Sequence, residues 1–342
     1  MLLCAVFVQG CSLIDDDLSV CGSDMQLEIQ MQLVTNLDLE LETTLSAETD
    51  VYTRTILHDY FSNIFTDHAH DISIGFYNTT SDELVYSIHD TIDATQSTYT
   101  FYLPKANYYA IALANIDENG VVNITDQSNS RLAKMETPSS DTLPSQQTGL
   151  FTASLETYVQ DTADQKIDIV LHMANCAFAL VIDTGFVHVE DMRGILCGMA
   201  DGLVLRDSLY THSKPKITRM ERIEPEANAA ERRNYGTTEL RMSAPQEDAD
   251  TARYCLFGCA SFPSPDEAEL GSYYQAKVYV ELEDGTTTET VLSLYEPLKA
   301  GQLKIVRLDL QPDGSVVPTQ GSEVGVTVTL DWKDGGTHTI EF

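Results

Sequence analysis

The sequence is poor in basic residues and has a single tryptophan. Its 342 residues include 20 Lys or Arg against 53 Asp or Glu, which gives a formal net charge of −33 at pH 7. So few cations cannot form a basic face that offsets phosphate repulsion, so nucleic acid is not an expected partner. The same deficit argues against adhesion to an anionic membrane through a polybasic surface. Because hydrophobic residues make up 43%, a core can form, and the charge favours a well-solvated exported protein.

The common catalytic and cofactor motifs are also missing. The sequence has no Gly-x-Ser-x-Gly elbow, no His-Glu-x-x-His, no Gly-rich phosphate loop and no dinucleotide fingerprint. His68 and His70 could offer two imidazoles to a metal, but they follow a predicted helix, where a turn is expected. Asp117-Glu-Asn-Gly120 lacks the later ligands of a calcium loop, so a hairpin turn is predicted. We therefore expect no enzyme activity, no cofactor and no metal.

The cysteines do not form an obvious disulfide framework. There are seven, of which five remain if Cys4 belongs to a leader and Cys11 is modified, and an odd number cannot all pair within the chain. Cys255 and Cys259 could hint at a disulfide or a zinc site. If their segment is a strand, however, residues four apart lie about 13 Å apart, too far for a disulfide. Buried free thiols are the expectation.

No apolar run reaches the roughly 20 residues that a membrane-spanning helix needs. The first eight residues of MLLCAVFVQG are apolar, which is typical of the end of a signal peptide. Val8-Gln9-Gly10-Cys11 resembles a lipobox, in which the cysteine accepts a lipid, although Gln9 fits poorly. The usual basic segment is missing, so we expect that Met1 is not the natural start or that the sequence is truncated. The alternative is an N-terminal strand with an incidental cysteine.

An acidic run follows the lipobox. Asp15, Asp16 and Asp17 resemble the export signal that moves lipoproteins to the outer leaflet in Bacteroidetes, although a solvated linker could have the same composition. We therefore interpret residues 1–24 as a signal remnant, a lipobox and an acidic tether. Acyl chains such as palmitate on Cys11 would then be the only membrane contact.

Alternation of apolar and polar residues predicts short strands through most of the chain, beginning with residues 25–34. Residues 50–68 break the alternation, since their apolar side chains fall near helical spacing and Asp50 can cap the start. This segment is the one predicted helix. Residues 126–148 are expected to form a loop or long crossover, and residues 214–234 an exposed loop.

A polar break near residue 160 separates two sets of predicted strands. Hairpin turns such as Glu283-Asp284-Gly285 punctuate the second set. The sequence therefore predicts an all-β fold of two tandem β-sandwiches, over residues 25–160 and 161–342, with one short helix in the first half.

Three segments carry a family likeness: CSLIDDDLSVC at residues 11–21, the first predicted strand MQLEIQMQLVTNL, and the closing segments LKAGQLKIVRLDL and GVTVTLDW. They resemble the fimbrillin-type subunits of Bacteroidetes, and most of all the lipid-tethered anchor subunits of their fimbriae. The resemblance implies two transthyretin-like β-sandwiches, a role in cell adhesion and a place on the cell outer membrane at the base of a fimbria. It also implies fimbrillin subunits as partners, joined by β-strand donation.

In polymerising subunits of that family an Arg-specific protease removes the first strand. Arg54 and Arg131 are the only arginines between residues 25 and 160, and Arg54 falls in the predicted helix. Because a cut there would also release the lipid, the resemblance suggests an anchor that keeps its first strand. The C-terminal segment THTIEF could be a strand donated to another subunit or a last strand that pairs within its own chain, and the sequence leaves both open.

The alternative function is a glycan-binding surface lipoprotein beside an outer-membrane importer. Such sites use exposed aromatic platforms, and Tyr108-Tyr109 and Tyr273-Tyr274 each place one ring on each face of a predicted strand. Ordinary sandwich strands do the same, and Trp332 is expected in a core. A fimbrial tip adhesin and an enzyme complete the alternatives.

Overall fold

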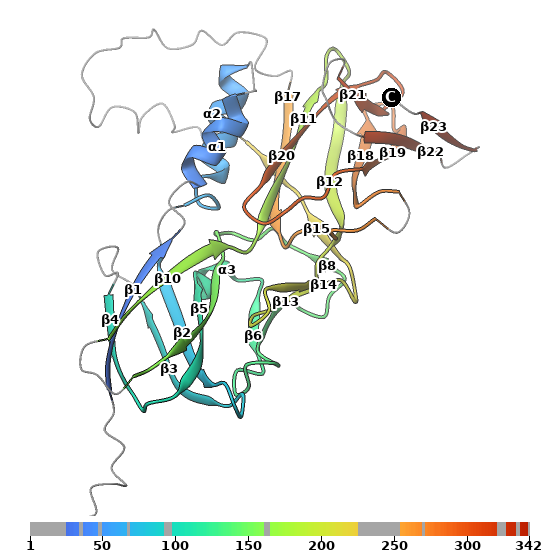
Figure 1. Ribbon diagram of the computed structural model, residues 1–342. Helices are drawn as coiled ribbons and strands as arrows, with labels where there is room; N and C mark the ends of the chain where they lie inside the picture. The colour runs from blue at the N-terminus through green and yellow to red at the C-terminus, as the bar shows by residue number, and fades with distance from the viewer. Residues whose placement is uncertain are drawn as a thin grey trace, which may run out of the picture.

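Strands dominate the computed structural model, and three helices occur among the residues that it describes (Figure 1). The described ranges are residues 25–33, 37–46, 50–66, 69–91, 98–160, 165–224, 254–268, 271–319, 326–332 and 336–340. The predicted all-β class is confirmed.

The first sheet has the strand order β3-β2-β5-β9-β10-β1-β4. Its strands are β1 (Met25–Leu33), β2 (Asp71–Asn78), β3 (Leu84–Thr91), β4 (Thr98–Leu103), β5 (Asn107–Ala114), β9 (Phe151–Tyr158) and β10 (Gln165–Met173). β9 and β10 pair at only two positions, so the sheet folds over and its two parts face each other. Across the resulting sandwich the rings of Phe76 and Phe101 meet edge to face, with centroids 5.4 Å apart.

Strand β10 lies beyond residue 160, yet it belongs to this first sheet. It pairs parallel with β1 and antiparallel with β9. The N-terminal sandwich therefore uses residues up to Met173. A polar break marks a chain reversal, and the strand that follows can return to the same sheet. The predicted domain boundary near residue 160 remains a prediction, because strand β10 on the far side of it pairs with strands on the near side.

The second sandwich is formed by two sheets, in the orders β16-β17-β11-β20-β21 and β23-β22-β19-β18-β12-β15-β8. The first of these contains β11 (Cys176–Asp183), β16 (Glu221–Ile223), β17 (Tyr254–Ser261), β20 (Leu303–Leu310) and β21 (Val316–Pro318). The other contains β8 (Thr142–Leu143), β12 (Val189–Met199), β15 (Lys216–Arg219), β18 (Tyr274–Leu282), β19 (Thr287–Leu294), β22 (Val326–Trp332) and β23 (Gly336–Ile340). Alternate residues of β11, such as Phe178 and Leu180, enter the core between the two sheets.

A small fourth sheet joins the two halves of the chain. Its order is β14-β13-β7-β6, with β6 (Asn123–Thr125), β7 (Lys134–Glu136), β13 (Gly202–Val204) and β14 (Leu209–Thr211). The segment 126–148, expected as a loop or crossover, thus supplies β7 to this sheet and β8 to the C-terminal sandwich. The expected exposed loop at 214–234 is wrong over its first part, which forms β15 and β16. Lys216 is buried there because its Nζ donates to two carbonyl oxygens, those of Pro138 and Ser140, at 2.9 Å each.

The helices are α1 (Leu37–Ser46), α2 (Val51–Phe61) and α3 (Ile116–Asn119). Helix α2 confirms the predicted helix, and Asp50 caps it by accepting a hydrogen bond from the Thr53 amide at 2.7 Å. Helix α1 was not predicted, since its sequence LDLELETTLS begins with a strand-like alternation. Helix α3 replaces the expected hairpin turn at Asp117-Glu-Asn-Gly120.

Although α1 and α2 lie early in the sequence, they cover the outer face of the β11 sheet (Figure 1). The face offers small side chains such as Ala177 and Ala179, which lets the helices approach closely. Gly258 in β17 is the tightest point, because a Cβ there would lie 2.5 Å from Cε1 of Tyr60. Tyr60 also donates hydrogen bonds to Glu221 Oε2 at 2.8 Å and to the Gly258 carbonyl at 3.1 Å. The helix pair is thereby fixed to the C-terminal sandwich.

Candidate functional site

The first strand is an integral part of the N-terminal sandwich. β1 pairs parallel with β10 on one side and antiparallel with β4 on the other. Leu27 and Ile29 point into the core and are 0% exposed, whereas Glu28 and Gln30 are exposed. In this structure the position between β10 and β4 is therefore filled by the chain's own residues, and the backbone groups on both sides of β1 have partners.

Neither arginine of the N-terminal half lies in an extended, accessible linker. Arg54 is in the first turn of α2, and its amide donates to the Asp50 carbonyl at 3.0 Å. Arg131 is exposed, but its Nε lies 2.8 Å from Asp82 Oδ2. Its backbone amide donates to Asn129 Oδ1 at 3.0 Å, so both its side chain and its backbone are held in place. A protease needs several residues in extended form, so cleavage at Arg54 requires the helix to open first.

The C-terminal strand pairs within the chain. β23 runs antiparallel to β22 and is the last strand at one edge of its sheet. In this structure the C-terminal strand therefore pairs within its own chain, and its outer edge has no neighbouring strand among the described residues. Of the segment THTIEF, Glu341 and Phe342 lie outside the described residues, as does the side chain of Trp332.

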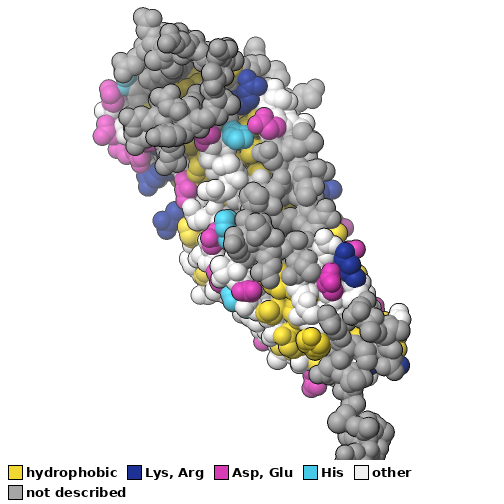
Figure 2. Space-filling model, turned by 90° about the vertical axis from the view of Figure 1, so that its left-hand side faces the viewer, with side chains coloured by type: hydrophobic (Ala, Val, Ile, Leu, Met, Phe, Trp, Pro, Cys, Tyr) yellow, Lys and Arg dark blue, Asp and Glu magenta, His cyan; other side chains and the backbone are white. Residues whose placement is uncertain are grey.

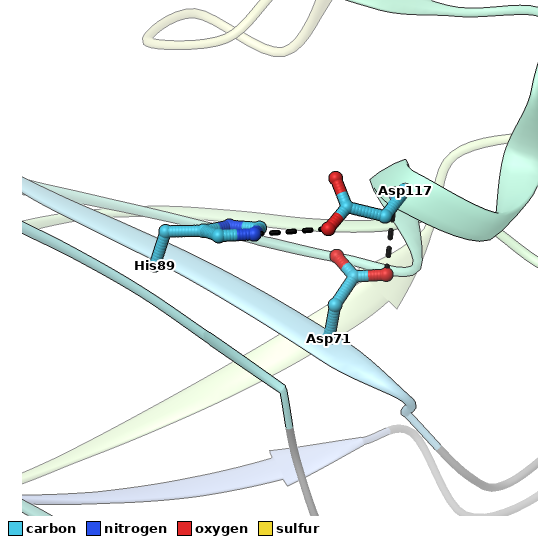
Figure 3. A group of neighbouring side chains, drawn as sticks. All are labelled: Asp71, His89 and Asp117. Atoms are coloured by element: carbon cyan, nitrogen blue, oxygen red, sulfur yellow. Dashed lines mark hydrogen bonds and ion pairs between the residues drawn. The ribbon is translucent and has the colours of Figure 1, made fainter.

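A second feature is a cluster of two aspartates and a histidine where β2, β3 and α3 meet (Figure 3). One ligand atom from each of Asp71, His89 and Asp117 lies within 4.8 Å of the others. Asp71 accepts hydrogen bonds from the amides of Ile116 and Asp117 at 3.0 and 3.2 Å. His89 contacts Asp117 Oδ2 through Nε2 at 2.9 Å and Ser73 Oγ through Nδ1 at 2.7 Å.

These bonds give the cluster a structural explanation. Asp71 is 2% exposed, and burial raises the pKa of its carboxyl, while the two backbone amides that it accepts from lower it. Asp71, His89 and Asp117 each take part in at least one of these hydrogen bonds, and the bonds to Asp117 and to the Ile116 amide fasten α3 to the sheet. His70 lies nearby, 3.8 Å from Glu118, whereas His68 lies outside the described residues.

Comparison with known proteins identifies the family. The sequence profile of the family described as "Fimbrillin-A associated anchor proteins Mfa1 and Mfa2" matches residues 35–333. The chain belongs to this family. The expected resemblance to Bacteroidetes fimbrial subunits is thus confirmed, together with a fimbrial accessory or adhesin role at the cell surface. The family consists of fimbrial structural proteins, and no curated protein sequence matches this chain.

Solved structures share the fold. A candidate polysaccharide-binding protein from Bacteroides thetaiotaomicron has a TM-score of 0.52 at 9% identity, covering 93% of this chain and 99% of that chain. A candidate adhesin from Bacteroides ovatus has a TM-score of 0.53 at 7% identity, covering 93% and 96%. The fimbrial anchor protein Mfa2 from Porphyromonas gingivalis matches with a TM-score of 0.48 at 11% identity, covering 90% and 97%. The first two establish that this family member has their β-sandwich fold.

The residues predicted to attach the family member to a membrane lie outside the described part of the chain. They are Cys11, Asp15, Asp16 and Asp17. Lipid attachment and export therefore remain predictions. Among the described residues, no helix has the length and apolar character needed to cross a membrane.

The tyrosine pairs behave as sandwich residues. Tyr108 and Tyr274 are buried, at 1% and 3% exposure, and Tyr109 and Tyr273 are partly buried. Tyr109 packs on the face opposite Tyr108, whereas Tyr273 precedes β18 and packs against the same core as Tyr274. The predicted placement of one ring on each face is confirmed for Tyr108-Tyr109 and is wrong for Tyr273-Tyr274. Because one ring of each pair is in a core, neither pair offers two exposed platforms for a sugar.

The four cysteines in the described part of the chain are free thiols, as predicted. Cys176, Cys255 and Cys259 are buried, and Cys197 is partly buried. Cys255 and Cys259 share strand β17 and do not pair. Burial raises the pKa of the Cys176 and Cys259 thiols, so these thiols are protonated and unreactive at neutral pH.

A polar junction between the two sandwiches could not be found from the sequence. Asp82, after β2, accepts from Arg206 Nη1 at 2.8 Å and from Arg131 Nε at 2.8 Å. The Arg206 guanidinium also lies 3.9 Å from the ring centroid of Tyr109. Arg206 follows β13, so this network ties the N-terminal sandwich to the C-terminal half beside the shared small sheet. No local sequence pattern signals such a contact.

Proposed function

We propose that this protein is an anchor or accessory subunit of a fimbria, held to the outer membrane by a lipid on Cys11 and joined to fimbrillin subunits by β-strand donation. The observation that carries the proposal is the position of β1 in a member of the fimbrial anchor family. The strand closest to the lipidation motif is built into the sandwich, with Leu27 and Ile29 in its core.

A subunit that accepts a donated strand must have an open position in a sheet. Here the position between β10 and β4 is already filled, so another subunit cannot add a strand there while β1 stays. A subunit with this property ends a polymer on that side. That is the property required at the base, where the next component is the membrane rather than another subunit.

The arrangement of the two ends supports the same role. β1 begins at one end of the molecule, and the C-terminal strands β22 and β23 lie at the opposite end (Figure 1). A tether before β1 would place the N-terminal sandwich near the membrane and the β23 edge away from it. The next subunit could then pair with the β23 edge, or receive β23 as a donated strand, which would leave β22 at the edge.

The described residues lend the glycan-binding alternative little support. The two tyrosine pairs on which it depended each bury one ring. The likeness to a candidate polysaccharide-binding protein is at 9% sequence identity, so it supports a shared fold and not a shared ligand.

The proposal is tested on outer membranes extracted with detergent. We expect the purified protein to carry acyl chains on Cys11, to retain residues 25–33, and to run in a high-mass ladder with fimbrillins on an unboiled gel. Cys11→Ala should abolish acylation and surface retention. A mature form that lacks residues 11–54 would falsify the proposal. Recovery of a lone monomer, or of the protein with an outer-membrane importer as its only partner, would favour the glycan-binding alternative.

A further inference from the structure

Phe186 is the most exposed large apolar side chain in the described part of the chain. It is 101% exposed, whereas the other exposed large hydrophobic side chains there are between 36% and 63% exposed. Partly covered apolar residues are normal on a protein surface and need no explanation. A phenyl ring that no other group covers is different, because burial of the whole ring against a partner would be favourable.

Phe186 lies in the connection from β11 to β12, and this connection is firmly built. The Gly185 amide donates to Asp183 Oδ1 at 2.8 Å, and the Val187 amide donates to the Thr184 carbonyl at 2.9 Å. Gly185 has a φ of +55°, which glycine adopts without strain. Val187 packs against the core of the C-terminal sandwich. The ring is therefore presented on an ordered turn, so little conformational entropy would be lost when a partner covers it.

Three loops meet at this end of the C-terminal sandwich. They connect β11 to β12 (184–188), β18 to β19 (283–286) and β20 to β21 (311–315), and we refer to them as the distal loops. Strand β12 begins beside the end of β18, where Val189 pairs with Leu282, and β11 ends beside the end of β20. The connection from β11 to β12 stands near the top of Figure 1, whereas β1 begins in the lower part.

The charged residues of the distal loops have one sign. Glu283, Asp284 and Asp313 are exposed, and the three loops contain no Lys or Arg. The Thr288 hydroxyl donates to the Asp313 carbonyl at 3.0 Å, which holds the third loop beside the start of β19. On the side face shown in Figure 2, by contrast, Lys and Arg side chains occur among Asp and Glu. The distal loops therefore combine one fully exposed ring with carboxylates on the neighbouring loops.

We propose that the distal loops dock on another protein, which covers Phe186 with an apolar pocket bordered by Lys or Arg. The inference rests on the proposed function, since in an anchored subunit this end faces away from the membrane and meets the next fimbrial subunit. A buried aromatic ring can supply much of the binding energy, while opposite charges around it select and orient the partner. A second copy of the chain fits poorly, because two sets of carboxylates repel each other.

Docking of this kind uses side chains on loops and needs no open sheet edge, which separates it from strand donation. The attraction between exposed charges weakens as salt is added, because screening shortens its range to about 8 Å at physiological ionic strength. Burial of the ring does not depend on charge. The two contributions can therefore be measured separately.

The experiment measures binding of the purified full chain to fimbriae sheared from cells that lack it, by biolayer interferometry. Phe186→Ser removes the ring, and Leu209→Ser is the matched control, since it removes a 60% exposed apolar side chain from β14, outside the distal loops. We expect Phe186→Ser to raise the Kd at least about 10-fold and the control to match the parent. Because Phe186 is fully exposed, its replacement should leave the thermal unfolding of the chain unchanged.

A second variant removes the charge and keeps the turns. It combines Glu283→Gln, Asp284→Asn and Asp313→Asn. The Thr286 amide donates to Asp284 Oδ1 at 2.9 Å and the Ser315 amide to Asp313 Oδ1 at 3.0 Å, and an asparagine side-chain oxygen can accept the same bonds. We expect this variant to bind more weakly than the parent at about 50 mM NaCl, and the difference to narrow at about 500 mM.

Each outcome has one meaning. Parent and Phe186→Ser chains that bind fimbriae equally well overturn the inference and leave the anchor intact, and so does a dimer of the chain that depends on Phe186 in sedimentation. A charge variant that binds as tightly as the parent at low salt overturns the basic border of the pocket. The ladder on unboiled gels is scored separately. A parent that does not bind in a strain whose ladder contains fimbrillins removes only the docking surface, whereas loss of both removes the anchor as well.

Discussion

Replacing Ile29 with alanine tests whether β1 is a permanent part of the core. Ile29 is 0% exposed and stands between Tyr99 of β4 and Ile167 of β10 in the sheet. Truncating a fully buried Ile to Ala removes apolar contacts and leaves a cavity, at a cost of about 2–5 kcal/mol. We expect a loss of this size in the free energy of unfolding of the N-terminal sandwich.

The matched control is Glu28→Ala, one residue earlier on the opposite, exposed face of β1. It should change the free energy of unfolding by no more than about 0.5 kcal/mol, as is usual for surface sites. Both changes fall in the same strand, so the comparison isolates burial from strand propensity.

Hydrogen exchange read by mass spectrometry on peptides covering residues 25–33 is the assay, because it reports this strand separately from the C-terminal sandwich. A loss of 2 kcal/mol corresponds to about 30-fold faster exchange of amides that open with the sandwich. If Ile29→Ala and Glu28→Ala exchange at the same rate, β1 is not held by its core residues. The position between β10 and β4 would then be available to a strand from another subunit, and the base-of-fimbria argument would fail.

Three further outcomes are expected. Gly258→Ala should lower stability by about 1–3 kcal/mol in thermal unfolding, because the new Cβ would collide with Tyr60; no change would mean that α2 is free to shift. Burial raises the pKa of the Asp71 carboxyl. Its contribution to the free energy of unfolding is therefore fully present below the unfolded-state pKa of about 3.9 and is lost as the pH rises through the folded-state pKa. Asp71→Asn should remove this contribution, so plots of stability against pH that run parallel for the variant and the parent would refute it. Cys176 and Cys259 should resist iodoacetamide at pH 8 in the native protein and react after denaturation, and rapid native alkylation would contradict their burial.

The strands were predictable because each carries its own signal. In β10 and β18, buried and accessible residues alternate along the whole strand, as expected for strands that face a core on one side. Helix α2 could also be predicted from the sequence, because its capping residue Asp50 and its helical spacing of apolar residues lie within one short segment. Helix α1 shows the limit of the method. Its Leu-Asp-Leu-Glu-Leu start alternates like a strand, and its packing against α2 and β20 in the folded chain favours a helix.

The pairing of distant segments was not predictable. Nothing around residue 165 says that β10 returns to pair with β1, because register depends on faces that only the folded sheet brings together.

Strands β10 and β11 suggest how an anchor of this fold would carry load. They are separated by only Ala174 and Asn175, so one nearly continuous stretch runs from the first sheet into the second. β10 pairs parallel with β1 over seven positions, and β11 pairs parallel with β20 over seven. A pull applied at the start of β1 would therefore load each pair along its length, where all its hydrogen bonds share the force.

The joint between these strands is correspondingly well fixed. Asn175 is 0% exposed, its Nδ2 donates to Gln146 Oε1 and to the Thr148 carbonyl at 2.9 Å each, and its Oδ1 accepts from the Leu150 amide at 3.1 Å. Asp82 and Arg206 clamp the two halves at a second point. Because buried polar networks of this kind are costly to break when fully satisfied, bending between the sandwiches is opposed at both points. A rigid joint would transmit a pull from the tether to the C-terminal sandwich without first opening the N-terminal one, which is the mechanical requirement of a fimbrial base.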